Sequence, residues 1–138
     1  MKKILSLIGI SFLSSCFTQQ PKEVYDSSSI SVLNTVAYPA CDFEVKVLDN
    51  QTDFDALQKS IPKTGPRSGP LFKIDFEKSN VAVVCKKDIF SYAVDRIEVY
   101  KNENQLIISP IPNYSKNEGD DQNLLILEIP KAINTLKL

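Results

Sequence analysis

Val81-Ala82-Val83-Val84-Cys85 is a continuous apolar run within a chain of 138 residues. A strand without a polar face must be buried on both sides, so we expect this run at the centre of a β-sheet. The stretch Leu124–Ile129 is a second, mostly apolar run of similar length. The two runs therefore predict two buried strands.

More strands are expected around these two. Asp42 to Val47 alternates polar and apolar residues, as a strand with one solvated face does. In Ser91–Tyr100 the alternation changes phase near Asp95-Arg96, and a β-bulge there would restore a single buried face. Leu106–Ile108 follows closely enough to form a hairpin with that strand. Further short strands are predicted at Ile30–Tyr38, Leu71–Phe76 and Thr135–Leu138.

The segment Thr52–Ser60 is the best helix candidate in the sequence. Thr52 is suited to cap its N-terminus, and apolar residues recur at helical spacing along it. Pro62 disfavours helical geometry in the residue before it, so the helix cannot pass Ile61. One short helix among hairpin-connected strands predicts an α+β domain with a mostly antiparallel sheet, as a sandwich or an open, barrel-like arrangement.

The N-terminus reads as a targeting signal. Met1-Lys2-Lys3 is basic, and the mostly apolar run Ile4–Leu13 is too short to span a bilayer, which takes about 20 apolar residues. The run ends in Leu13-Ser14-Ser15-Cys16, which resembles the lipobox of bacterial lipoproteins. The resemblance implies lipidation of Cys16 and cleavage before it. The alternatives are an ordinary secretory signal with a chance cysteine, or a buried helix.

The lipobox divides the chain into three parts. We expect a signal peptide at 1–15, a flexible tether at 16–29 and a single β-rich globular domain at 30–138. Two or more acyl chains on Cys16 anchor a protein stably, so the domain would be held at a membrane surface. Phe17 follows the cysteine, where an aspartate would indicate retention at the inner membrane. The sequence thus predicts the bacterial cell envelope and favours the outer membrane.

The composition excludes several kinds of chemistry. The chain has no His and four Gly, and it contains neither a GxGxxG nor a P-loop pattern. Ser-His-Asp catalysis, His-ligated metals and phosphate-cradling loops are therefore absent in their usual forms. The net charge of -1 gives no basic footprint for nucleic acid. We expect a non-enzymatic protein with no cofactor and no nucleic-acid partner.

Cys41 and Cys85 are the two thiols that remain once Cys16 is lipidated. A location outside the cytosol lets disulfides persist, and both cysteines lie in or beside predicted strands, so we favour a disulfide between them. The alternative is two separate buried thiols that pack as small apolar side chains.

The candidate partner-binding residues combine the two side-chain types most enriched at binding hot spots, arginine and tyrosine. They are Arg67, Tyr92, Arg96 and Tyr114. The alternative for Tyr92 is ordinary packing in a sheet. The loops 62–70 and 112–123 are the segments expected to present a binding surface, although a solvated connector is the stronger interpretation of the first.

An acidic group lies in the second of these loops. Glu118, Asp120 and Asp121 are carboxylates of the kind that ligate calcium or act as a glycosidase pair. Their spacing is not that of an EF-hand loop, and a solvated acidic turn is the stronger interpretation.

The second half of the chain resembles the C-terminal domain family named for a protease-complex-stabilising subunit (PrcB-like). The resemblance covers residues 43–138, and its main motifs are Ile74-Asp75-Phe76-Glu77-Lys78 and the closing Ile129-Pro130-Lys131. Phe90-Ser91-Tyr92 stands where that family carries Gly-Gly-Tyr, so the tyrosine alone carries over. The resemblance implies a non-catalytic, β-rich envelope domain that binds or steadies another protein, with a protease as one such partner.

These observations predict a lipid-anchored envelope protein that binds or stabilises another envelope protein. Two alternatives stay open. A carboxylate-dependent hydrolase acting on envelope polymer would use acids such as Asp120 and Asp121, and a small-ligand-binding lipoprotein would need a large apolar pocket in the sheet.

Overall fold

Two central strands, β3 (Ser79–Lys86) and β6 (Gln122–Pro130), pair antiparallel at the middle of the main sheet. The computed structural model describes residues 21–38, 41–62, 72–86, 94–110 and 122–138. In those residues the main sheet has the order β1-β6-β3-β2, and a separate hairpin pairs β4 with β5. The remaining elements are η1 (Ser27–Ser29), β1 (Ser31–Tyr38), β2 (Val45–Leu48), α1 (Gln51–Ser60), β4 (Val94–Tyr100) and β5 (Gln105–Pro110).

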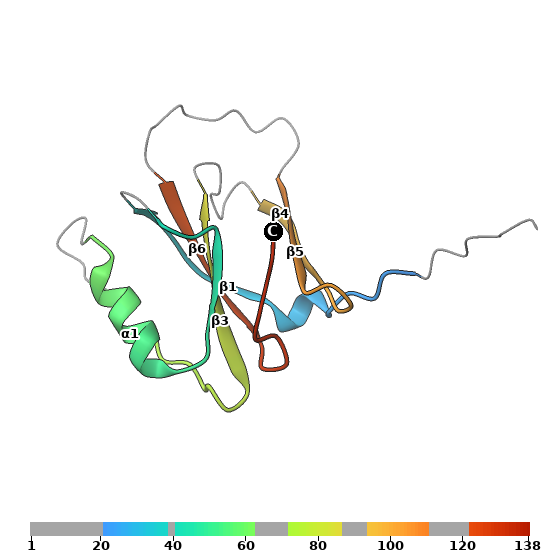
Figure 1. Ribbon diagram of the computed structural model, residues 1–138, viewed down its shortest axis with the longest axis horizontal. Helices are drawn as coiled ribbons and strands as arrows, with labels where there is room; N and C mark the ends of the chain where they lie inside the picture. Colours follow the sequence, from blue (N-terminus) through green and yellow to red (C-terminus); the bar gives the residue numbers. More distant parts are fainter. Residues whose placement is uncertain (1–20, 39–40, 63–71, 87–93, 111–121) are drawn as a thin grey trace, which may run out of the picture.

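The main sheet is covered on both faces, so that the described residues form three layers (Figure 1). Side chains of β3 alternate between the faces: Val83 contributes to the core beneath α1, and Val84 contributes to the core beneath the β4–β5 hairpin. Both side chains are fully buried. The expected central strands and the α+β, mostly antiparallel fold are confirmed, as an open sandwich and not a closed barrel.

Helix α1 begins at Gln51, one residue before the predicted start at Thr52. Asn50, not Thr52, is the N-cap: its Oδ1 accepts a hydrogen bond from the backbone N–H of Asp53 at 2.9 Å. Phe54 is fully buried against the sheet, and its ring meets that of Phe76 edge-on with 6.3 Å between the centroids. The helix ends at Ser60, next to the extended Ile61, as Pro62 requires.

The strand predicted at Leu71–Phe76 is absent from residues 72–76. The side chains of two glutamines on α1 instead form hydrogen bonds with main-chain groups of this segment. Gln58 accepts from the N–H of Phe72 at 2.7 Å and donates to its carbonyl at 3.1 Å, while Gln51 accepts from the N–H of Ile74 at 3.2 Å. Since the two glutamines are seven residues apart, they lie on one helix face and fasten this segment to α1.

The hairpin agrees with its prediction. The register of β4 against β5 shifts between Val94 and Arg96, which is the expected bulge. Asn104 has φ of 50° in the connecting turn, a conformation that asparagine tolerates. The short edge strand predicted at Thr135–Leu138 is reduced to a single parallel bridge between Gln105 and Lys137.

The segment before β1 lies against the domain. Tyr25 donates its N–H to the carbonyl of Val99 at 2.9 Å, and Lys101 donates to the carbonyl of Glu23 at the same distance. Tyr25 also packs on the core beneath the hairpin. Glu23 and Tyr25 belong to the expected tether at 16–29, and both are hydrogen-bonded to the domain, at Lys101 and at Val99 of β4. Residues 16–20 of that segment lie outside the described ones.

Phe54→Ala should destabilise the domain strongly. Replacing a fully buried Phe leaves a cavity between α1 and the sheet, and such changes cost about 3–5 kcal/mol of unfolding free energy. The measurement is chemical denaturation of the purified protein. The control is Phe72→Ala, since this ring is 39% exposed and its loss should change stability much less. Equal losses for the two variants would contradict the packing described for α1.

Candidate functional site

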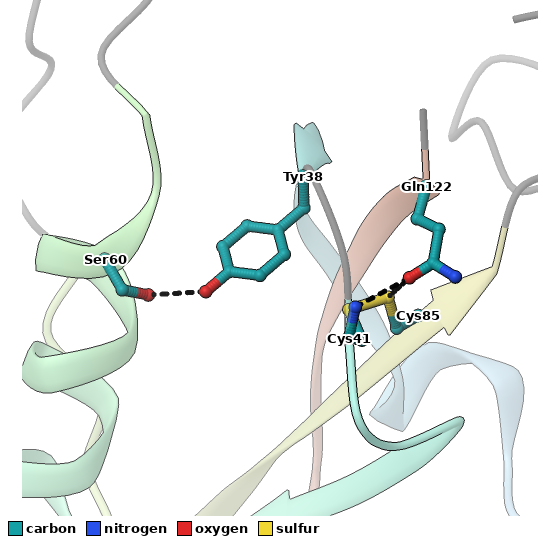
Figure 2. The surroundings of a disulfide bond; sticks show 5 residues. All are labelled: Tyr38, Cys41, Ser60, Cys85 and Gln122. Atoms are coloured by element: carbon teal, nitrogen blue, oxygen red, sulfur yellow. Dashed lines mark hydrogen bonds between the residues drawn. A yellow bond between two sulfur atoms is a disulfide. The ribbon is translucent and has the colours of Figure 1, made fainter. Parts of the chain in front are cut away.

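A disulfide joins Cys41 to Cys85 at the end of β3, with 6.4 Å between the Cα atoms. This confirms the disulfide that the sequence favoured. Figure 2 shows its surroundings, in which Gln122 Oε1 accepts from the N–H of Cys41 at 2.7 Å. The same oxygen lies 3.2 Å from Cys85 Sγ, which is a contact and not a hydrogen bond because a disulfide sulfur carries no hydrogen. The disulfide and Gln122 thus fix the segment that leads into β2.

Next to the disulfide, a groove of about 450 Å³ lies between β2 and α1. Its walls come from the end of β1, the segment before β2, the α1-facing side chains of β2 and one stripe of the helix. These residues are Tyr38, Cys41, Asp42, Phe43, Lys46, Leu48, Asp53, Ala56, Leu57 and Ser60. At one end, Tyr38 reaches towards the helix, and its hydroxyl lies 3.3 Å from Ser60 Oγ (Figure 2).

The groove mixes apolar walls with a few charged groups. Lys46 Nζ lies 4.4 Å from the centre of the Phe43 ring, a cation–π arrangement. None of the ion pairs among the described residues involves Asp42 or Asp53. Asp53 accepts a hydrogen bond from Asn50 Nδ2 at 2.9 Å. The groove thus presents polar and charged side chains next to the apolar Phe43, Leu48 and Leu57, so a ligand there would meet both kinds of surface.

The groove adjoins an open edge of the main sheet. Cys85 donates its N–H to the carbonyl of Glu44 at 2.8 Å, and these two residues are opposite each other in the β2–β3 register. In an antiparallel ladder, directly opposed pairs alternate between pairs that share main-chain hydrogen bonds and pairs that do not. Since Glu44 is bonded to Cys85, every second residue after it, Lys46 and Leu48, also directs its N–H and C=O groups to β3. The N–H and C=O groups of Val45 and Val47 therefore point away from β3. Among the strands that the structure describes, β2 is the last one on this side of the main sheet.

Of the predicted partner-binding residues, the structure describes Arg96. Arg96 lies on β4, is exposed, and has its Nε 3.4 Å from Glu98 Oε1. Arg67, Tyr92 and Tyr114 lie outside the described residues, as do Cys16 and the acidic group at 118–121. Among the described residues, no three His, Cys, Asp or Glu side chains are grouped to hold a metal ion.

Sequence reasoning missed the groove residues. Lys46 and Leu48 alternate with the core-facing Val45 and Val47, a pattern that predicts a strand but not its place at the edge of the sheet. Phe43 precedes β2 and is outside this alternation. Asp53, Ala56 and Ser60 are spaced so that they lie on one face of the helix. The spacing is visible in the sequence, but it does not show which other element this face lies against.

No family model, curated protein or solved structure matches this chain. Over the described residues, no helix is both long and apolar enough to cross a membrane.

Thiol labelling of the denatured protein should modify neither Cys41 nor Cys85 before reduction and both after it, because the disulfide blocks these two thiols. Mass spectrometry of the peptides that contain each cysteine locates the labels. Closing a loop with a sequence separation of 44 stabilises the fold by about 4 kcal/mol in the chain-entropy model, so reduction should also lower the unfolding midpoint. Labels on both Cys41 and Cys85 without reduction would contradict the disulfide.

Proposed function

We propose that this chain is a lipid-anchored, non-catalytic protein of the bacterial envelope that binds or stabilises another envelope protein. The observation that carries the binding role is the groove between β2 and α1, which lies beside an open strand edge. Clefts of this volume are typical of binding sites, and this one presents apolar side chains beside polar and charged ones. A protease of the envelope is the partner class that the family resemblance implies.

The location rests on the N-terminal sequence and is supported by the disulfide. Cys16 follows Leu13-Ser14-Ser15 at the end of an apolar run, as in lipoproteins. The bond between Cys41 and Cys85 is the kind of bond that persists outside the reducing cytosol. Lipid anchoring would place the groove near the membrane surface, where envelope proteins are concentrated.

A second candidate function is the binding of a small ligand in the same groove. A volume of about 450 Å³ lies within the usual range for small-molecule sites. The open side of the groove favours a polypeptide, because a small ligand in this position would remain partly exposed. The acids of the alternative carboxylate-dependent hydrolase, at 118–121, lie outside the described residues.

The test is crosslinking of the full-length protein in its native envelope, followed by purification under denaturing conditions and mass spectrometry. We expect one protein to be captured in stoichiometric amount, because a dedicated partner occupies its site at equilibrium. Capture of no stoichiometric protein would contradict the proposal and direct the search to small ligands.

The matched control is Cys16→Ala, which removes the lipidation site and leaves the groove intact. This variant should leave the membrane fraction, and its partner should be captured less because the two proteins no longer share a surface. Membrane retention of Cys16→Ala equal to that of the wild type would contradict the lipid anchor.

A further inference from the structure

Both edges of the β4–β5 hairpin are covered by other parts of the chain. On the β4 side, the N–H of Tyr25 donates to the carbonyl of Val99 at 2.9 Å. On the β5 side, the N–H of Leu106 donates to the carbonyl of Lys137 at 2.8 Å. Short N-terminal and C-terminal segments therefore take the positions that an added strand would need.

The outer edge of the main sheet at β1 is interrupted. The register of β1 against β6 shifts between Val32 and Asn34, and Asn34 Oδ1 accepts a hydrogen bond from the N–H of Thr35 at 2.8 Å. A bulge and a side chain that bonds the main chain are two devices by which proteins prevent pairing at an edge. Three of the four edges in the described residues are thus covered or interrupted.

The β2 edge is the exception. Val45 and Val47 direct their N–H and C=O groups away from β3, and among the described residues no other main-chain hydrogen bond reaches them. The side chains that alternate with them, Lys46 and Leu48, line the groove. A free row of main-chain groups next to a groove is the arrangement that proteins use to bind an extended segment by strand addition.

We propose that the β2 edge binds an extended segment of the partner protein as a fifth strand of the main sheet, with alternate side chains of that segment entering the groove between β2 and α1. This inference rests on the proposed function and specifies how that binding occurs. The main-chain groups of Val45 and Val47 form the hydrogen bonds to the segment, and the groove determines which side chains the segment can carry.

The lining of the groove indicates the chemistry of the segment. Among the described residues that line the groove, Asp42 and Asp53 supply two carboxylates and Lys46 supplies one ammonium. Since Lys46 Nζ is held over the Phe43 ring, the two carboxylates favour a basic side chain on the segment. Leu48 and Leu57 favour an apolar one beside it. Every second side chain of the segment therefore faces α1, and these side chains include a Lys or Arg and an apolar residue.

The first test uses a displayed library of random peptides of about ten residues, the upper length of an ordinary strand. The bait is the full-length lipoprotein in detergent. Enriched peptides should carry a basic and an apolar residue two positions apart. A selected peptide is then synthesised with single backbone N-methyl groups. Methylation should abolish binding at every second residue and be tolerated between them, because N–H groups of a strand alternate in direction.

A second test changes the protein. Val45→Pro removes an outward N–H at the first residue of β2, where proline is tolerated in a strand. It should weaken binding of the selected peptide at least about tenfold, whereas the matched control Val45→Ala keeps the N–H and should bind within about threefold of wild type. Asp53→Asn should weaken the preference for a basic residue, because one of the two carboxylates in the groove is then neutral. Thermal unfolding of each variant shows that it is folded.

Several results would overturn the proposal. They are enrichment of no peptide, tolerance of N-methylation without alternation, and equal binding to Val45→Pro and Val45→Ala. Dimerisation of the free protein that Val45→Pro abolishes would instead assign the edge to a second copy of this chain. If Val45→Pro still captures the envelope partner at the wild-type level, strand addition fails while the proposed function stands. Capture of no partner by the wild type refutes the proposed function itself.

Discussion

The antiparallel pairing of β3 with β6 is the constraint on which the rest of the structure depends. Both strands carry buried apolar side chains on their two faces, so the sheet that contains them needs a covering layer on each side. Helix α1 covers one face, and the β4–β5 hairpin covers the other. Asn80, buried at the start of β3, accepts a hydrogen bond from Lys131 Nζ at 3.0 Å and donates to the carbonyl of Ile133 at 2.8 Å. These bonds hold the C-terminal segment over the hairpin side.

The covering layers also determine which part of the sheet is open. The hairpin takes up the N-terminal and C-terminal segments along its own edges, and α1 holds residues 72–75 through Gln51 and Gln58. The disulfide fixes the approach to β2 but leaves the outer side of that strand uncovered among the described residues. The groove and the open edge are therefore produced by the same arrangement of α1 against β2.

Local sequence signals predicted the central strands, the hairpin with its bulge and the position of the helix, because each depends on residues close together in the chain. The apolar run at Val81–Cys85 admits few other structures. The strand predicted at 71–76 failed because its alternating pattern cannot reveal that Gln51 and Gln58 take its hydrogen bonds. The groove was not predicted, since it requires the sheet order, and strand order depends on contacts between distant segments.

Amide hydrogen exchange followed residue by residue by NMR tests the open edge of β2 most directly. The account predicts fast exchange at Val45 and Val47 and slow exchange at Lys46 and at Leu106, whose N–H groups are bonded to β3 and to Lys137. Protection of Val45 and Val47 equal to that of Lys46 in the free monomer would show that another part of the chain covers this edge, and would contradict the account.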